Sequence, residues 1–483
     1  MRDTPELSQI LHRLSCSLPP ADDPRLRHTE LFSLTLDTPG FRLSTLPPLE
    51  PPFLYWHSPQ QDCRRLGIGR VHATPAHGPQ RLATLGEGQR RLQQHWLHEN
   101  VSADGRTAPA LFCVAGFDPD DDMQGPWEGL PNSTLLLPRL LFHERGRRST
   151  LTLSCTKAEL QQRERLLTEW SQQLALVYSA VSDAGGGPDE NSVALCRRTD
   201  GDDDWHGMVR EAIGAIEAGQ LQKVVAARSV RVAAERPFSV AAVLARLERL
   251  YPSCQLLAIG LDERTLVSAT PERLASLHAG IIECDALGGT TGRAPDPRHD
   301  HSLGLRLLNS RKARHEHALV VEAIRDTLTP LCTRLEVPKN PGIERLRNLQ
   351  HLKTTLRGTL RPGTGLLEVA HRLHPTPAVA GTPTAAACDW LQRHENLRRG
   401  WYSGLAGWLH KDGGGELAVL LRCALLRGSE AELFAGAGIV ADSDPAAELH
   451  ETGMKLRAMY EALQGEPDCR KLAATPGRRA RRS

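Results

Sequence analysis

The sequence predicts an α+β protein built on antiparallel β-sheets. One observation is that the strand-like runs "QLLAIG" (255–260) and "TLVSAT" (265–270) follow one another with only a short connection. Another is that two buried strand-like runs, "GELAVLLRCALL" (415–426) and "AELFAGAGIV" (431–440), are also consecutive. Strands that follow one another directly pair as antiparallel neighbours, whereas a doubly wound parallel sheet needs a helix between them.

The first part of the chain is the least regular. Residues 1 to about 180 are rich in Pro, His and Arg and carry short strand-like runs such as "PALFCVAGF" (109–117) and "STLLLPRLLFHE" (133–144). The glycine-rich stretch "SDAGGGPDENS" (182–192) then has the composition of a flexible connection.

The pattern becomes sharper after this stretch. Asp204 or a neighbour can cap a helix that ends near Gly219, because apolar residues recur at helical spacing between them. The segment "LQKVVAARSV" (221–230) follows as a strand, and its alternation puts Lys223, Val225 and Ala227 on one face.

Further elements follow in order. We expect a helix over "FSVAAVLARLERL" (238–250) with Ser239 as its cap, and a strand running into a glycine-rich loop over "GIIECDALGGTTGR" (280–293). A long helix is expected over residues 310–331. A last helix begins after Ser443 or Asp444 as cap, with Pro445 in its first turn.

Composition excludes several classes of protein. The 59 basic residues nearly balance the 57 acidic ones, which argues against a nucleic-acid binder. The 11 cysteines are scattered without CxxC spacing, so reduced thiols in the cytoplasm are expected rather than disulfides or a zinc site. No apolar signal segment and no apolar run of about 18 residues is present, so we expect a protein with no membrane partner.

The last helix carries a group of charges that could perform chemistry. Glu448, Glu451 and Lys455 lie at positions i, i+3 and i+7, so they share one helical face. A solvated ladder of charges would produce the same pattern. Alternatively, two adjacent glutamates hold a cation between them, and the preceding "GAG" (436–438) lets a ligand approach the backbone.

Three other residues have side chains suited to catalysis or metal binding. Glu316, in "RHEHALVVEAI", can offer a carboxylate to a hard cation, and it lacks the HExxH spacing of a zinc site. Lys223 would lose proton affinity if its apolar strand is buried, and would then be a usable base. Glu272, in "ATPERL", can remain protonated in an apolar site and act as an acid. We expect both pKa values to move toward neutrality.

These segments, in this chain order, resemble the chorismate-utilising enzymes, and among them the isochorismate synthases. The resemblance covers roughly residues 205–462 and rests on "LQKVVAARS", "ATPERL", "DALGGTTGR", "RHEHALVVEAI", "HLKTTLRGTL", "LHPTPAVAG", "RGWYSGLAGWL", "LAVLLRCALL" and "AGAGIVADSDPAAELHETGMK". It implies an α/β sandwich of large antiparallel sheets with helices packed outside. Apart from the resemblance, the basic run at the end of the chain predicts that residues 466–483 form a disordered tail, because terminal charge runs rarely fold. The resemblance also implies that residues 1–190, which match only weakly through "FLYWHSP", belong to the same fold and that 191–465 form the chorismate-binding region. We therefore interpret 182–192 as a surface loop.

The resemblance also implies roles for individual residues. Lys223 would be the general base that activates a water, and Glu272 the general acid that protonates the departing ring hydroxyl. Glu316 and Glu451 would bind Mg²⁺, with Glu448 assisting directly or through water. The substrate-binding residues would be Gly289, Thr290, His351, Tyr402, Arg422, Gly436, Ala437, Gly438 and Lys455.

Several alternatives remain within and outside the family. Lys223 argues against anthranilate synthase, whose base position is typically glutamine, and Gly288 argues against aminodeoxychorismate synthase, which has a lysine there. Ala313 replaces an acidic residue of some relatives. A salicylate synthase, which also eliminates pyruvate, and a non-catalytic protein with the same fold are the remaining alternatives. The pathway, menaquinone or salicylate and siderophore synthesis, stays open, and a monomer is expected.

Overall fold

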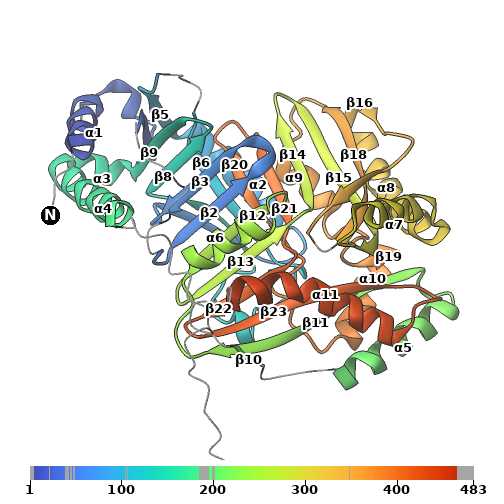
Figure 1. The fold of residues 1–483 in the computed structure, drawn as a ribbon. Helices are drawn as coiled ribbons and strands as arrows, with labels where there is room; N and C mark the ends of the chain where they lie inside the picture. Colours follow the sequence, from blue (N-terminus) through green and yellow to red (C-terminus); the bar gives the residue numbers. More distant parts are fainter. Residues whose placement is uncertain are drawn as a thin grey trace, which may run out of the picture.

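Two large β-sheets form the centre of the protein (Figure 1). The computed structural model describes residues 5–20, 22–38, 43, 46, 49–103, 105, 107–183, 195–197, 202–347 and 349–464. Within these residues, the 13-stranded sheet has, in spatial order, the strands β10 (Leu195–Arg197), β11 (Lys223–Ala234), β23 (Glu430–Ile439), β22 (Cys423–Arg427), β13 (Arg264–Thr270), β12 (Gln255–Leu261), β2 (Phe53–Ser58), β3 (Cys63–Ile68), β8 (Leu140–Arg145), β9 (Arg148–Thr156), β1 (Leu31–Asp37) and β5 (Trp96–Asn100), and β19 (Gly381–Thr382) pairs with β11.

The second sheet contains ten strands within the same described ranges. Their spatial order is β16 (Cys332–Glu336), β18 (Leu349–Leu360), β15 (Ile281–Gly292), β14 (Arg273–His278), β21 (Gly415–Val419), β20 (Leu405–His410), β6 (Ala110–Ala115), β7 (Ser133–Leu137) and β4 (His72–Ala76), and β17 (Gly342–Arg345) pairs with β18. The predicted pair β12–β13 is antiparallel, as are β11–β23 and β15–β18, whereas β1 and β5 pair in parallel.

Helices cover the outer faces of both sheets (Figure 1). They are α1 (Pro5–Ser17), α2 (Arg81–Gln94), α3 (Lys157–Gln161), α4 (Arg163–Asp183), α5 (Asp202–Glu217), α6 (Val240–Leu250), α7 (Pro297–Asn309), α8 (Arg311–Leu328), α9 (Leu366–Leu373), α10 (Thr384–His394) and α11 (Pro445–Gln464). Short 3₁₀ turns lie at Pro24–Leu26, Pro59–Gln61, Gly125–Trp127 and Thr329–Leu331.

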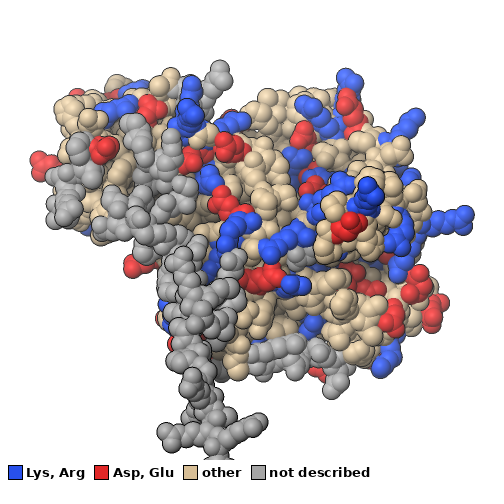
Figure 2. Space-filling view, viewed as in Figure 1, with Lys and Arg blue, Asp and Glu red and all other residues tan. Residues whose placement is uncertain are grey.

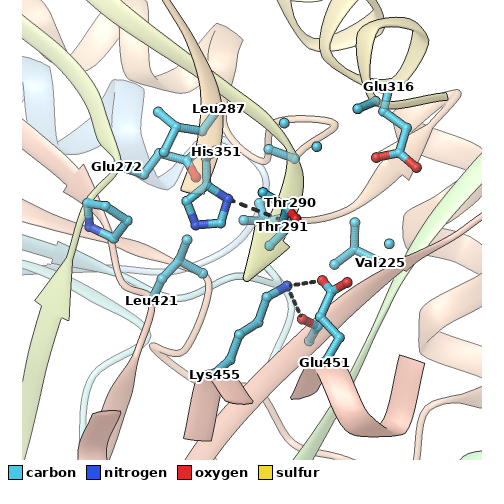
Figure 3. A pocket seen from close by; sticks show the side chains of 18 of the residues that line it. Val225, Glu272, Leu287, Thr290, Thr291, Glu316, His351, Leu421, Glu451 and Lys455 are labelled. Carbon is cyan, nitrogen blue, oxygen red and sulfur yellow. Dashed lines mark hydrogen bonds and ion pairs between the residues drawn. The ribbon is translucent and has the colours of Figure 1, made fainter. Parts of the chain in front are cut away.

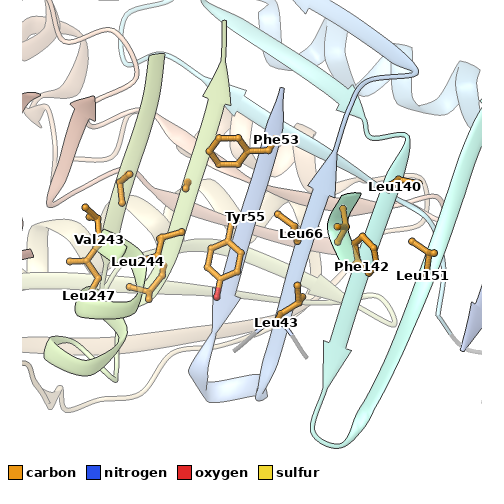
Figure 4. Packing of buried hydrophobic residues seen from close by; sticks show 14 of the residues in the cluster. Leu43, Phe53, Tyr55, Leu66, Leu140, Phe142, Leu151, Val243, Leu244 and Leu247 are labelled. Carbon is orange, nitrogen blue, oxygen red and sulfur yellow. The ribbon is translucent and has the colours of Figure 1, made fainter. Parts of the chain in front are cut away.

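Strand alternation explains why the layers stack in this way. In β2, Phe53 and Tyr55 pack with the outer helices, whereas Leu54 and Trp56 join a core between the two sheets. Figure 4 shows Phe53 and Tyr55 on the same side of the sheet as the side chains of α6. In β6, Phe112 points to the central core, while its neighbours pack under helices on the other outer face. Alternate residues therefore serve two different cores, and the result is the predicted sandwich with helices outside.

Both halves of the chain contribute to both sheets. Strand β2 pairs with β12, and β6 pairs with β20, each through a continuous antiparallel ladder. The two sheets are therefore assembled from interleaved segments of residues 31–156 and 195–439. Ser182 and Asp183, the first two residues of the predicted loop 182–192, belong to the end of α4. The rest of that predicted loop and the predicted tail 466–483 lie outside the described residues.

Local predictions were confirmed in part. The Ser239 hydroxyl accepts a hydrogen bond from the Ala242 N–H and caps α6, and the Asp444 carboxylate accepts one from the Ala447 N–H at the start of α11. Helix α5 begins at Asp202, two residues before the suggested cap Asp204. The prediction of glycine-rich loops was wrong, because "GGTT" lies within β15 at a bulge between Gly288 and Thr290, and "GAG" lies within β23.

The run "GELAVLLRCALL" was also interpreted incorrectly, and the reason bears on the site. It forms two strands, β21 and β22, which belong to different sheets. The chain crosses between the sheets at residues 420–422, and Arg422 there has a left-handed backbone, with φ of 47°. Arg422 is the single charged residue at this crossing, and one charged residue does not by itself mark a change of sheet.

Surface charge, helix hydropathy and the cysteines can all be compared with the sequence predictions over the described residues. On the face shown in Figure 2, basic and acidic side chains are intermixed. Among the described helices, none is long and apolar enough to cross a membrane. The ten cysteines in the described part of the chain are free thiols.

Candidate active site

Two neighbouring crossings between the sheets create the setting of the site. The chain passes from β13 to β14 through Pro271 and Glu272, and returns from β21 to β22 through residues 420–422. Backbone hydrogen bonds hold the two crossings together: the Val419 N–H donates to the Glu272 carbonyl at 3.0 Å, and the Ala269 N–H donates to the Arg422 carbonyl at 3.1 Å. Glu272 and Arg422 are thereby fixed side by side.

A cavity of about 520 Å³ opens beside these crossings, which is within the usual range for a small-molecule site. It brings together thirteen of the fourteen site residues indicated by the sequence, namely Lys223, Glu272, Gly289, Thr290, Glu316, His351, Tyr402, Arg422, Gly436, Gly438, Glu448, Glu451 and Lys455. Ala437 is the exception. Its side chain is fully buried in the core on the other face of β23, because strand alternation turns it away from its glycine neighbours.

Lys223 is the first residue of β11 and is only 6% exposed. Burial lowers the pKa of its ammonium group, which favours the neutral amine, and the charge of Glu316 is the largest effect in the opposite direction. The expected direction of the shift is therefore confirmed.

Glu272 is even less exposed, at 4%. Its backbone is held by the Val419 contact and by the Thr270 hydroxyl, which accepts a hydrogen bond from the Glu272 N–H at 3.2 Å. Burial, together with the negative charge of Asp285, raises the pKa of Glu272 to about 8. The carboxyl group is thus protonated at neutral pH, as expected for an acid.

A row of hydrogen bonds links the crossing to the neighbouring sheet. One Arg422 nitrogen, Nη2, lies 3.0 Å from His351 Nε2. On the other side of the same ring, His351 Nδ1 lies 3.2 Å from the Thr290 hydroxyl (Figure 3). Because a guanidinium group only donates, Nε2 must accept and the ring proton must be on Nδ1. Burial and the nearby Arg422 hold the pKa of His351 well below its usual range, so this ring is neutral. The arrangement orients a planar cation toward the cavity.

Two glycines bring the backbone of β23 close to the cavity. A Cβ atom at Gly438 would lie 2.7 Å from Lys223 Cε, and one at Gly436 would lie 2.9 Å from the Tyr402 hydroxyl. Gly289 has a φ of 67°, and a Cβ there would lie 2.8 Å from the Ala313 Cβ on α8. Side chains at these positions would therefore displace the residues around the cavity.

Three carboxylates and a lysine from α8 and α11 also line the cavity, namely Glu316, Glu448, Glu451 and Lys455. Lys455 Nζ lies 2.7 Å from the Glu451 carboxylate and donates to the Gly436 carbonyl at 2.8 Å (Figure 3). This ion pair lowers the pKa of Glu451. Burial raises the pKa values of Glu316 and Glu448, and the charge of Glu451 raises both further, although Ser443 donates a hydrogen bond to Glu448 at 2.8 Å.

These carboxylates suit a hard cation only in part. Within the described ranges, no three His, Cys, Asp or Glu residues are grouped closely enough to hold a metal ion by themselves. Magnesium, however, is commonly held by one or two carboxylates together with water and substrate oxygens. Glu316 and Glu448 repel Glu451, and a cation between them would relieve that repulsion. The donor chemistry therefore fits a magnesium ion completed by a ligand.

Sequence reasoning missed several lining residues. Lys312 lies four residues before Glu316 on α8 and reaches Asp442 at 3.6 Å, and its charge lowers the pKa of Glu316. Its i, i+4 spacing to Glu316 was a usable signal. Val379 and Leu421 also line the cavity, but apolar residues in connecting segments carry no comparable signal.

Comparison with known proteins agrees with this geometry. Residues 25–464 match the family model described as chorismate binding enzyme. The chain belongs to the chorismate-binding enzyme family. This chorismate-binding enzyme is 35% identical over 421 residues, or 85% of each chain, to the salicylate biosynthesis isochorismate synthase of Pseudomonas aeruginosa. It is 31% identical over 417 residues to the isochorismate synthase MenF of Bacillus subtilis, which covers 85% of this chain and 88% of the relative.

Among solved structures, the chorismate-binding enzyme is similar to the menaquinone-specific isochorismate synthase of Escherichia coli, with a TM-score of 0.77 and 27% identity over 95% of this chain and 99% of the other. Because that alignment spans nearly both chains, the similarity includes the N-terminal strands as well as the segments that form the cavity.

The protonated state of Glu272 predicts how a substitution changes stability with pH. Between its ordinary pKa of 4.5 and its folded-state pKa of about 8, the folded protein holds a proton that the unfolded chain has released. Wild-type stability therefore falls across this window as pH rises. The glutamine in Glu272→Gln cannot ionise. The free energy of unfolding of this variant, relative to that of the wild type, should therefore rise by on the order of a few kcal/mol between pH 5 and pH 9.

Urea unfolding at both pH values measures this difference. Glu263→Gln is the matched control, because the Glu263 side chain is 78% exposed, and it should show the same stability difference at both pH values. An equal difference for Glu272→Gln at pH 5 and pH 9 would contradict the assignment.

Proposed function

We propose that this chorismate-binding enzyme is an isochorismate synthase. The observation that carries the proposal is that a buried amine, Lys223, and a buried carboxyl group, Glu272, line one cavity with pKa values displaced in opposite directions. Groups with such opposed environments are suited to act as base and acid in one reaction. The names of the relatives support the same activity.

The proposed reaction moves a ring hydroxyl of chorismate. The neutral Lys223 amine accepts a proton from a water molecule as the water oxygen bonds to one ring carbon. The Glu272 carboxyl group donates its proton to the hydroxyl that leaves another ring carbon, so a second water departs. The ring double bonds shift, and no oxidant or reductant is needed. Water is a poor nucleophile and hydroxide a poor leaving group, which is why both proton transfers are required.

The charges of the cavity suit a substrate with two carboxylates. Arg422 offers a forked, planar donor that the hydrogen bond to His351 orients. Lys455, which donates to the Gly436 carbonyl, provides a second cation in the cavity. The edge of β23 beyond Phe434, where β22 no longer pairs with it, leaves main-chain groups that can also contact the substrate.

Magnesium is proposed as the cofactor. Glu316 and Glu451 would hold it, with Glu448 contributing directly or through water, and a substrate carboxylate would complete the ligands. When bound, the ion neutralises a substrate carboxylate that would otherwise face these glutamates. The protein itself must hold the side chains of Glu316, Glu448 and Glu451 toward the cavity. For Glu448 this is done by the hydrogen bond that Ser443 donates to its carboxylate.

The product would feed either menaquinone synthesis or synthesis of salicylate and siderophores, since the chain is similar both to a menaquinone-specific isochorismate synthase and to one named for salicylate biosynthesis. We further propose that the enzyme acts in the cytoplasm, in keeping with its scattered free thiols, and that it acts as a monomer.

Turnover of chorismate tests the proposed roles directly. Lys223→Ala and Glu272→Gln should each lower kcat by roughly 10²–10⁴-fold, because each removes one proton transfer. In the wild type, kcat/KM should fall above about pH 8, where Glu272 loses its proton. Lys339→Ala, at an exposed position, is the control and should retain full activity.

The product is identified by chromatography. Isochorismate as the sole product supports the proposal, whereas pyruvate and fluorescent salicylate would assign a salicylate synthase. Substantial residual turnover by either variant would remove its residue from the mechanism, and wild-type protein without turnover at any magnesium concentration would point to a binding protein.

The close approach of Gly438 to Lys223 predicts a selective loss of activity. Gly438→Ala forces the lysine side chain to move, because the new Cβ would lie 2.7 Å from Cε. We expect kcat to fall by on the order of 10²-fold, since small misplacements of a reacting group have large effects, while the fold is retained. Gly453→Ala in α11 has open space around it and should keep wild-type turnover. Normal activity of Gly438→Ala would contradict the placement of Lys223.

Magnesium dependence can be measured by chelation and by binding. Dialysis against a chelator should abolish turnover, and added Mg²⁺ should restore it. Glu316→Gln and Glu451→Gln should raise the Mg²⁺ concentration for half-maximal activity at least about 10-fold, because each removes a charged ligand. Glu322→Gln, at an exposed position of the same helix as Glu316, is the control and should leave this Mg²⁺ concentration unchanged. Activity that persists without any divalent ion would refute the metal's role.

A further inference from the structure

A buried ion pair lies directly behind the cavity and is not part of its lining. Arg399 and Glu395 are each 4% exposed in their side chains and are joined by two hydrogen bonds, Nε to Oε1 at 2.6 Å and Nη2 to Oε2 at 2.7 Å. They occupy the segment between α10 and β20. Nothing in the proposed reaction uses either charge, although removing two charges from water is unfavourable unless their geometry is exact.

The remaining hydrogen-bonding capacity of the pair is directed at separate segments of the cavity wall. Arg399 Nη2 donates to the Val225 carbonyl at 2.6 Å, and Nη1 donates to the Val379 carbonyl at 2.9 Å and to the Ser403 hydroxyl at 3.1 Å. Val225, Val379 and Ser403 all line the cavity. One guanidinium group therefore joins three parts of the wall that are far apart in the sequence.

Glu395 secures the same strand from a second point. Its Oε2 accepts a hydrogen bond from the Ala227 N–H at 3.0 Å. The carbonyl of Val225 and the N–H of Ala227, both on the edge of β11 that faces the pair, are thus bound by the two partners of one ion pair. Lys223 lies two residues before Val225 on the same face of this strand.

The pair is itself held in place from behind. The Arg399 guanidinium lies 4.3 Å from the centre of the Phe117 ring. The Phe117 N–H donates to the Gly400 carbonyl at 2.8 Å, and the Trp127 ring N–H donates to the Arg398 carbonyl at 2.9 Å. The segment that carries the pair is therefore anchored on residues from the N-terminal half of the chain.

We propose that Arg399 and Glu395 are positioning residues, which set the place of Lys223 relative to the wall formed by Val379 and Ser403. This inference rests on the proposed function for its consequence in catalysis. The pair touches no substrate and transfers no proton. A buried ion pair is weak evidence for stability, since apolar residues of similar size often replace one without loss, but its directed hydrogen bonds fix geometry that apolar contacts do not.

The test separates positioning from stability. The double variant Arg399→Met/Glu395→Leu removes both charges together and so leaves no unpaired buried charge. We expect it to fold, with a thermal midpoint lowered because the Ala227 N–H and the Val225 and Val379 carbonyls lose their partners. The kinetic comparison is therefore made well below that midpoint. Its kcat should fall at least 10-fold while KM changes less than about threefold, because the base is misplaced rather than the substrate released. Arg399→Lys keeps the positive charge but loses the forked guanidinium group, so its kcat should lie between that of the wild type and that of the double variant.

A matched control is available in the same segment. Arg398 and Asp122 form a pair at 3.1 Å, with side chains 54% and 50% exposed. Arg398→Met/Asp122→Leu should leave kcat and KM unchanged. A double variant at 399 and 395 that turns over chorismate like the wild type would overturn the proposal.

A second measurement does not depend on activity. Amide hydrogen exchange in the peptide over residues 223–228 should be faster in Arg399→Met/Glu395→Leu than in the wild type, since the Ala227 N–H loses its acceptor. The control double variant should exchange like the wild type. Unchanged exchange would also overturn the proposal. If the wild type fails to convert chorismate, the proposed function fails, and exchange over 223–228 still decides whether the pair holds β11.

Discussion

The geometry of the cavity depends on two backbone hydrogen bonds between neighbouring crossings of the chain. Val419 donates to the carbonyl of Glu272, and Ala269 donates to the carbonyl of Arg422, where the chain passes between the two sheets in opposite directions. A carboxyl group and a guanidinium group are thereby fixed at one junction of a sandwich. Because both sheets continue on either side, neither crossing can shift without breaking a ladder.

Electrostatics gives the titratable residues of the cavity two different states. At Lys223 and Glu272 burial dominates, and it drives both side chains toward their neutral forms. On the side of α8 and α11, charges remain, and Glu451 with Lys455 shows that an ion pair can be held there. The proposed base and acid are thus neutral, and they lie directly beside the charged groups, because Glu316 is the charge that acts most strongly on Lys223 and Arg422 is fixed next to Glu272.

Much of this was readable from the sequence, and the failures have physical causes. Alternation in "LQKVVAARSV" placed Lys223 on one face with Val225, and helical spacing grouped Glu448, Glu451 and Lys455. The crossing inside "GELAVLLRCALL" was missed, because a single charged residue, Arg422, between apolar neighbours does not by itself mark a change of sheet. Glycines in β15 and β23 suggested loops, since glycine weakens strands, but here it permits close approach of other residues. Arg399 and Glu395, at i and i+4, have the spacing of an ordinary surface pair, and only the fold buries them.

The N-terminal half takes part in the site although it provides almost none of its lining. Trp127 stacks on Phe434 with ring centres 5.5 Å apart, and Phe434 in turn stacks on Tyr402 at 5.3 Å. Phe434 and Tyr402 both line the cavity, so its aromatic wall rests on a residue more than 270 positions earlier in the chain. Phe117 supports the Arg399–Glu395 pair in the same way. Residues that support a wall need only suitable size and shape, whereas residues that face a ligand need particular chemistry. This difference explains why the first part of the chain carries few recognisable motifs and yet contributes strands to both sheets.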